Sequence, residues 1–205
     1  MVIILKILAV ADIHGSQYRL NLVLKNIDRY SPDLLVVCGD ITQFGPGELA
    51  KNFLDQIPID TLAVTGNIDS VDVEKGIDDS KATKIEMKKV FKKGFSFVGL
   101  TGLYYDHIKI IDEKKMIDEK TILVTHVPPY DSKDKVFIGM HGGSKELREL
   151  VDKYQPRLVL CGHIHEDPGF TKIGNTMVIN CSMGKKGEGA LIDLNHKINV
   201  KMLEN

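Results

Sequence analysis

The first 65 residues alternate between apolar runs and a helical pattern. Residues 3–11, 33–38 and 59–65 are apolar, β-rich runs that predict buried strands. Between the first two runs, apolar side chains recur at helical spacing, which predicts a helix over 17–30 that ends at Ser31-Pro32. A short helix is expected after Pro46. Continuously apolar strands that alternate with helices are typical of a parallel sheet covered on both faces.

The second half of the chain contains more strands than helices. Residues 85–100 predict a hairpin around Lys92-Lys93-Gly94, and residues 121–125 and 158–161 predict two further buried strands. A helix over 147–154 has Ser144 as its expected cap, and residues 169–203 predict three or four short strands. The whole pattern predicts an α/β (α+β) fold of two packed mixed β-sheets flanked by helices, with residues 1–205 as one domain.

Composition and charge exclude several classes of protein. The formal net charge of −1 lacks the excess of basic residues typical of dedicated nucleic-acid or membrane-surface binding. The apolar N-terminal run is interrupted by Lys6 and is too short to span a membrane, so we expect a buried strand there rather than a signal peptide. The three cysteines form no Cys-x-x-Cys pair, which favours a reducing, cytoplasmic location.

Polar residues follow five of the apolar runs at the point where each run ends. These five motifs are Asp12-Ile13-His14, Gly39-Asp40, Gly66-Asn67-Ile68-Asp69, His126 before Val127-Pro128-Pro129, and Gly162-His163-Ile164-His165. Ligands of open α/β sheets collect beyond the carboxyl ends of the strands, so these side chains are expected to converge on one crevice. We expect Asp-x-His and His-x-His to project both side chains from one side of an extended backbone. The glycines permit a sharp turn or a close backbone approach.

This set of donors predicts a metal centre. Asp12, His14, Asp40, Asn67, His126, His163 and His165 supply seven nitrogen and oxygen donors. Seven donors exceed what one transition metal needs but suit two ions about 3.5–4 Å apart that share a carboxylate. Mixed imidazole and carboxylate ligands fit Mn²⁺ first, and also Fe, Zn²⁺, Ni²⁺ or Co²⁺.

The order of these motifs resembles the calcineurin-like metallophosphoesterases, and within them the branch that acts on cyclic nucleotides and the small prokaryotic phosphodiesterases. The resemblance implies two mixed sheets flanked by helices. It also implies that Asp12, His14, Asp40 and His165 hold one metal, while Asp40, Asn67, His126 and His163 hold the other. The reaction that it implies is attack on phosphorus by a hydroxide that bridges the two metals.

One motif departs from the family pattern. Ile68 stands where most members have a histidine that donates a proton to the leaving oxygen. General acid catalysis contributes about 10²–10⁴-fold, so monoesters with poor leaving groups are expected to react slowly. His141, next to Gly142-Gly143, and Asp69 are the candidates for a catalytic role, although an ordinary loop histidine is the competing interpretation of His141. His107 and His196 lie among polar residues and are expected to be solvated.

The sequence thus predicts a two-metal phosphohydrolase that prefers phosphodiesters, acting on a small phosphate ester such as a nucleotide. A broad monoesterase and a catalytically weak metal-binding scaffold are the alternatives. A basic stretch over 81–93 could steer an anionic substrate, but a solvated surface is the preferred interpretation. The pattern carries no signal about the oligomeric state.

Overall fold

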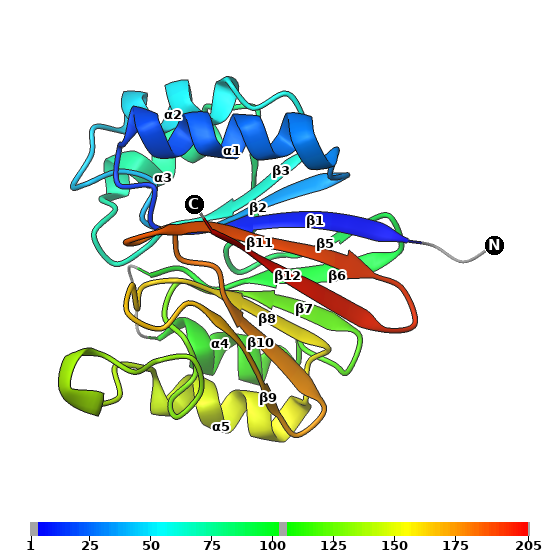
Figure 1. The fold of residues 1–205 in the computed structure, drawn as a ribbon. Coiled ribbons are helices and arrows are strands. Elements are labelled where there is room, and N and C mark those ends of the chain that lie inside the picture. Colours follow the sequence, from blue (N-terminus) through cyan, green and yellow to red (C-terminus); the bar gives the residue numbers. More distant parts are fainter. Residues whose placement is uncertain (1–3, 103–105, 205) are drawn as a thin grey trace.

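Two six-stranded sheets lie face to face, with three helices on the outer side of one sheet and two on the outer side of the other (Figure 1). This arrangement comes from a computed structural model, which describes residues 4–102 and 106–204. The predicted architecture of two packed mixed sheets between layers of helices is confirmed.

The first sheet has the strand order β12-β11-β1-β2-β3-β4. Its strands are β1 (Leu5–Val10), β2 (Leu34–Cys38), β3 (Thr61–Val64), β4 (Thr83–Lys84), β11 (Gly187–Leu194) and β12 (Ile198–Glu204). Strands β1 to β4 are parallel, whereas β11 pairs antiparallel with both β1 and β12. The strand β1 that carries the first motif therefore lies in the middle of this sheet, between β2 and a strand from the end of the chain.

The second sheet has the strand order β5-β6-β7-β8-β10-β9. Its strands are β5 (Lys89–Lys92), β6 (Phe95–Gly99), β7 (Thr121–Val124), β8 (Leu158–Cys161), β9 (Gly169–Ile173) and β10 (Thr176–Asn180). The predicted hairpin is present as β5 and β6, and the predicted C-terminal strands number four. Strands β6, β7, β8 and β10 are parallel, so the chain leaves β7 and β8 at the same edge.

Within residues 4–102 and 106–204, five α-helices and one 3₁₀ helix connect the strands. They are α1 (Gln17–Tyr30), α2 (Gly47–Asp55), α3 (Val71–Asp78), α4 (His107–Glu113), η1 (Phe137–Gly139) and α5 (Lys145–Tyr154). Helix α1 ends as predicted, because Ser31 adopts a left-handed conformation and its backbone N–H donates to the Ile27 carbonyl. The Ser144 side chain caps α5 by accepting from the Leu147 N–H at 3.1 Å.

Three apolar layers hold these elements together. One lies between the sheets, one between the first sheet and α1–α3, and one between the second sheet and α4–α5. The sequence pattern did not predict α3, since only Val73 and Ile77 of its side chains are buried, too few to give a periodic signal. Within the described residues, no helix has both the length and the apolar character that crossing a membrane requires.

Candidate metal centre

All five motifs lie in loops that leave the carboxyl ends of parallel strands. Asp12 and His14 follow β1, Asp40 follows β2, and Asn67 follows β3. His126 follows β7, and His163 and His165 follow β8. Strands β1, β2 and β3 belong to the first sheet and β7 and β8 to the second. The loops of both sheets meet at one edge of the sandwich, where the sequence predicted that these side chains converge.

The backbone reaches this edge in a conformation that the sequence analysis did not foresee. Asp12, His14, Asp40 and His163 have φ angles of 63°, 53°, 50° and 68°. The expected extended Asp-x-His and His-x-His segments are therefore wrong: the chain turns sharply at each motif. Left-handed residues other than glycine cost about 1–3 kcal/mol each and persist where the surrounding structure enforces them.

Glycines allow the loops after β2 and β3 to touch. A Cβ atom on Gly66 would lie 1.9 Å from Asp40 Oδ1, and one on Gly39 would lie 2.7 Å from Gly66 Cα. Gly39 also has a φ of 87°, which favours glycine. The predicted need for close backbone approach is confirmed here, because a side chain at either position would push Asp40 out of the site.

The ligand atoms of five side chains lie within a few ångströms of one another. Asp12 Oδ1 lies 3.3 Å from His165 Nε2 and 3.9 Å from His14 Nε2. Asp40 Oδ2 lies 3.3 Å from His126 Nε2 and 4.0 Å from His14 Nε2. Two groups of three, Asp12 with His14 and His165 and Asp12 with Asp40 and His126, have the spacing to hold a metal ion.

The environment of His126 is suited to a metal ligand. Its ring is fully buried, and Nδ1 lies 2.9 Å from the Cys38 carbonyl oxygen, which fixes Nδ1 as the protonated nitrogen of the neutral ring. Nε2 is buried and makes no hydrogen bond with any described residue, although Asp40 Oδ2 faces it at 3.3 Å. Burying such a nitrogen unsatisfied is costly unless a ligand completes it. The donor set of this edge therefore fits divalent metal ions.

Backbone groups and one arginine hold the two carboxylates in place. The His163 N–H donates to Asp12 Oδ2 at 3.1 Å, and the Ile68 N–H donates to Asp40 Oδ1 at 3.3 Å. Arg19 Nη1 on α1 donates to the Asp12 carbonyl oxygen at 2.7 Å. The two N–H groups thus hold the carboxylates, and Arg19 holds the main chain at Asp12.

Burial and close charges shift the pKa values of this cluster in opposite directions. Burial favours the neutral carboxyl of Asp12, but His165 and His126 outweigh that effect and lower its pKa to about 2. Burial favours neutral His126, but Asp40 and Asp12 outweigh it and raise its pKa to about 9. Burial lowers the pKa of His163, with a further contribution from His126. The Asp12 carboxylate thus stays charged, while His126 carries a proton that a metal would replace.

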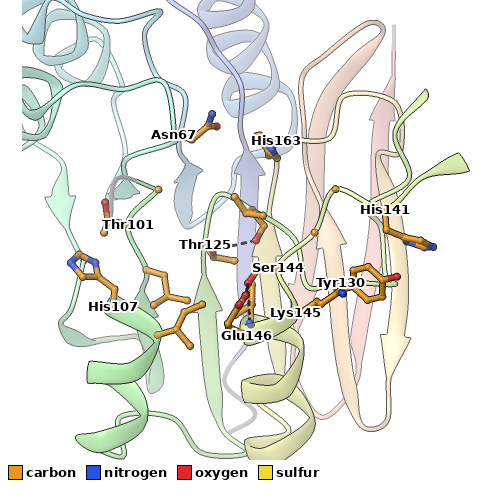
Figure 2. Close-up of a pocket in the computed structure, with 17 residues that line it drawn as sticks. Asn67, Thr101, His107, Thr125, Tyr130, His141, Ser144, Lys145, Glu146 and His163 are labelled. Atoms are coloured by element: carbon orange, nitrogen blue, oxygen red, sulfur yellow. Dashed lines mark hydrogen bonds between the residues drawn. The ribbon is translucent and has the colours of Figure 1, made fainter. Parts of the chain in front are cut away.

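Asn67 differs from the other predicted ligands because its side chain is exposed. It lines a cleft of about 580 Å³ together with His163, and both lie at the same end of it (Figure 2). The two residues therefore connect the buried cluster to the cleft where a substrate could lie.

Asp69 is a buried structural anchor in this structure. Its Oδ1 accepts hydrogen bonds from the Thr42 N–H and hydroxyl at 3.0 and 3.2 Å, and its Oδ2 accepts from the N–H groups of Ile41 and Gly66 at 3.1 and 2.9 Å. Burial raises the pKa of this carboxyl, while the backbone donors oppose the shift. These four donors tie the loop after Asp40 to the loop before Asn67.

His141 lies away from the metal cluster. Figure 2 shows it on the far side of the cleft from Asn67, with its ring directed away from His163. Its Nδ1 lies 2.8 Å from Oδ1 of the fully buried Asp134, and Tyr130 packs near its ring at a centroid distance of 5.0 Å. His141 thus lines the same cleft as Asn67 and His163 but lies on the other side of it from Asn67.

Helix α4 corrects the expectation that His107 is solvated. His107 is half-buried rather than solvated and lines the cleft with Ile108, while Ile111 and Ile117 lie in the apolar layer under the second sheet. Desolvation by burial lowers the pKa of His107. Three apolar residues spaced among many charges give a weak helical signal, which is why the sequence pattern missed this wall of the cleft.

The basic stretch over 81–93 is neutralised by acidic partners. Lys89 Nζ lies 3.0 Å from Asp118, Lys92 Nζ 3.0 Å from Asp60, and Lys93 Nζ 2.6 Å from Asp33. Lys84 contacts both Glu74 and Asp78. The preferred interpretation of this stretch as an ordinary solvated surface agrees with these pairs.

Known proteins resemble this chain in sequence and in fold. The sequence profile described as "Calcineurin-like phosphoesterase" matches residues 5–167. "Uncharacterized protein MJ1162" of Methanocaldococcus jannaschii is 32% identical over 207 residues, which cover 89% of this chain and 90% of that protein. "Probable glycerophosphodiester phosphodiesterase GpdQ" of Arcobacter nitrofigilis is 27% identical over 185 residues, which cover 75% of this chain and 64% of that protein.

The fold has a counterpart among solved structures. A crystal structure described as a dimetal phosphatase from Danio rerio superimposes with a TM-score of 0.70 at 13% identity, covering 100% of this chain and 97% of that one. At this level of identity, the likeness shows that the two chains share a fold.

Proposed function

Because the chain belongs to the calcineurin-like phosphoesterases, a family of metal-dependent hydrolases of phosphoric esters, we propose that it is a phosphodiesterase with a two-metal centre. The observation that carries this proposal is the meeting of Asp12, Asp40 and His126, all buried, with His14 and His165 at the edge where both sheets end. Buried carboxylates and imidazoles that face one another are costly unless a cation completes them.

The ligands divide into two sets. Asp12, His14, Asp40 and His165 would hold one ion, and Asp40, Asn67, His126 and His163 the other. Asp40 is the candidate for the shared ligand, since its Oδ2 lies between His14 Nε2 and His126 Nε2, at 4.0 and 3.3 Å. Imidazole, carboxylate and amide donors fit Mn²⁺, with Fe, Zn²⁺, Ni²⁺ and Co²⁺ as the other candidates.

The metal ions and the chain supply different parts of the chemistry. When bound, two divalent ions polarise a phosphoryl oxygen and lower the pKa of water. The chain holds Asp12 and Asp40 through backbone N–H groups, fixes the His126 ring through the Cys38 carbonyl, and presents Asn67 and His163 to the cleft. A phosphate ester at this end of the cleft would place its phosphorus beside the ligand cluster.

The preference for diesters rests on the missing proton donor. Ile68 has no titratable group, the Asp69 carboxylate already accepts four hydrogen bonds, and His141 is directed away from the cluster. Without a general acid, the departing group must leave as a stabilised anion, so monoesters of poor leaving groups should react slowly. A relative named as a glycerophosphodiester phosphodiesterase adds support to a diester substrate.

The proposed setting is the cytoplasm, with a small phosphate ester as substrate, a nucleotide being one candidate. Cys38, Cys161 and Cys181 are all free and buried, which suits a reducing compartment.

The test compares turnover of bis-p-nitrophenyl phosphate with that of p-nitrophenyl phosphate by the Mn²⁺-loaded protein. We expect faster diester turnover, and a loss of at least about 100-fold in His163→Ala with loss of one bound ion. His196→Ala is the matched control, because His196 is an exposed histidine in the turn before β12.

Three results would contradict this proposal in different ways. Faster monoester turnover would indicate a broad monoesterase. No cleavage of either ester with two ions bound would indicate a metal-binding scaffold. A single bound ion in the wild-type protein would rule out the two-metal centre.

A further inference from the structure

The cleft that begins at Asn67 and His163 continues well beyond the ligand cluster. It runs between the first turns of α4 and α5 and has a volume of about 580 Å³ (Figure 2). Ligand sites for small molecules commonly have volumes of about 300–1,000 Å³, so the cleft has room for an organic group as well as a phosphate.

The walls of this cleft are largely apolar. Leu100 follows β6, Ile108 lies on α4, Val127 follows β7, and Leu147 lies on α5. Two of these aliphatic side chains thus follow strands of the second sheet, and the other two lie on the helices that cover it. An apolar group between them would be removed from water, which is favourable in proportion to the buried area.

Several polar side chains along the cleft already have partners within the protein. The Ser144 hydroxyl donates to Glu146 Oε2 at 3.0 Å, and Lys145 Nζ lies 5.3 Å from the centre of the Tyr130 ring. The Thr125 hydroxyl donates to the Val127 carbonyl oxygen at 3.3 Å. Both hydroxyls are therefore engaged within the protein, and the Lys145 ammonium lies against an aromatic ring.

The charges along the cleft also cancel. Beyond the histidines, Lys145 and Glu146 are the only lysine, arginine, aspartate or glutamate side chains among the described residues that line it, and they carry opposite charges. A second phosphate or a carboxylate on the substrate would therefore find no net positive charge in this part of the cleft, and would lose hydration on entering it.

We propose that the space between α4 and α5 is a binding subsite for one uncharged, largely apolar substituent of the phosphodiester, such as an aryl group, and that Ile108 determines this preference. This inference rests on the proposed function, because the phosphoryl group is held at the Asn67 and His163 end. It narrows the substrate to diesters with an uncharged organic group and excludes those whose substituent carries a further anionic group.

Direct binding tests the subsite without turnover. Titration calorimetry of the Mn²⁺-loaded protein compares methylphosphonate, phenylphosphonate and 4-carboxyphenylphosphonate, which share the metal-binding group. We expect phenylphosphonate to bind at least about tenfold more tightly than methylphosphonate, and the carboxylate to abolish that gain. Equal affinity for the phenyl and methyl compounds would overturn the inference, as would tighter binding of the carboxyphenyl compound.

Charge placed on the wall of the cleft provides a second test. Ile108→Lys should weaken phenylphosphonate about tenfold and tighten 4-carboxyphenylphosphonate, while methylphosphonate binding stays unchanged and shows that the fold is intact. Ile110→Lys is the matched control, since Ile110 is half-buried on the same helix but does not line the cleft. If Ile108→Lys misfolds, the comparison moves to Ile108→Ala, which should lose affinity for the phenyl compound alone. An unchanged preference in the folded variant would overturn the role of Ile108.

The outcomes separate the subsite from the proposed function. A phenyl preference in a protein that cleaves no diester would support the subsite and contradict the proposed activity. Diester cleavage with equal affinities for methylphosphonate and phenylphosphonate would support the proposed activity and contradict the subsite. If none of the three phosphonates binds the Mn²⁺-loaded protein, both proposals are wrong.

Discussion

The replacement Asp69→Asn separates an anchoring role from a catalytic one. The carboxylate is only 3% exposed, and each of its oxygens accepts two hydrogen bonds from the loops after β2 and β3. Asparagine has nearly the same shape but replaces one oxygen by an NH₂ group. In one orientation of the amide, its NH₂ group faces the Ile41 and Gly66 N–H groups, so that two donors lose their acceptor. In the other orientation it faces the Thr42 N–H and hydroxyl, of which only the hydroxyl can turn to accept.

The size of the effect follows from these contacts. A buried donor left without an acceptor costs about 1–3 kcal/mol, so two of them cost about 2–6 kcal/mol. Removing the buried charge offsets part of that cost, since burial already raises the pKa of this carboxyl. We expect Asp69→Asn to lower the free energy of unfolding by about 2–4 kcal/mol.

Urea unfolding of the metal-free protein at pH 7.5 measures this loss. Circular dichroism is the suitable signal, because the chain contains no tryptophan. Asp28→Asn is the matched control: Asp28 lies exposed on α1, and the same change there should cost less than about 0.5 kcal/mol. The metal-saturated Asp69→Asn protein should keep diester turnover within about tenfold of the wild type.

One pattern of results would refute this reasoning. If Asp69→Asn changes stability by less than about 1 kcal/mol while turnover falls more than 100-fold, then Asp69 acts on the substrate rather than on the loops. Its four hydrogen bonds would then be incidental to the fold.

Three further predictions concern pH, metal binding and surface charge. Burial raises the pKa of Glu86 above its ordinary value of 4.5, so the folded state binds this proton more tightly than the unfolded state and loses stability as the pH rises through the raised value. Urea unfolding of Glu86→Gln should show that this loss is gone. If the free energy of unfolding of Glu86→Gln depends on pH between 4.5 and 7.5 as it does in the wild type, the prediction is wrong. Mn²⁺ at 100 times its Kd should stabilise the protein by about 2.7 kcal/mol for each ion bound, measured by thermal or urea unfolding, and a chelator should reverse this; an unfolding curve that does not depend on metal would argue against the site. Lys89→Ala and Lys92→Ala should change kcat/KM for the diester by less than about twofold, because both lysines are paired with aspartates; a larger loss at low salt would restore the steering hypothesis.

Sequence patterns predicted the framework because hydrophobic periodicity reports local structure. The apolar runs became β1, β2, β7 and β8, which are buried throughout except at Lys6 of β1, and Ser144 and Ser31 mark helix ends as expected. Since strand ends are visible in the sequence, the motifs that follow them could be placed at one edge.

Other features depend on contacts between distant segments, which one sequence does not display. The left-handed φ angles of Asp12 and Asp40 are imposed by neighbouring loops, and nothing in the residue types required them. The role of Asp69 follows from donors 27 and 28 residues earlier in the chain. His107 looked solvated because its neighbours in sequence are polar, whereas its neighbours in space line the cleft.

The pairing of β1 with β11 has a consequence for synthesis of the protein on the ribosome. Leu5 pairs with Leu194 and Ala9 with Ala190, so the strand that leads to Asp12 and His14 is flanked on one side by a strand that is synthesised much later. Contacts of such long sequence separation form late and slow folding. The nascent chain must therefore carry an incomplete first sheet, with one edge of β1 open, until residues 187–194 have emerged. Metal capture at full affinity must therefore wait until β11 has been synthesised and paired with β1.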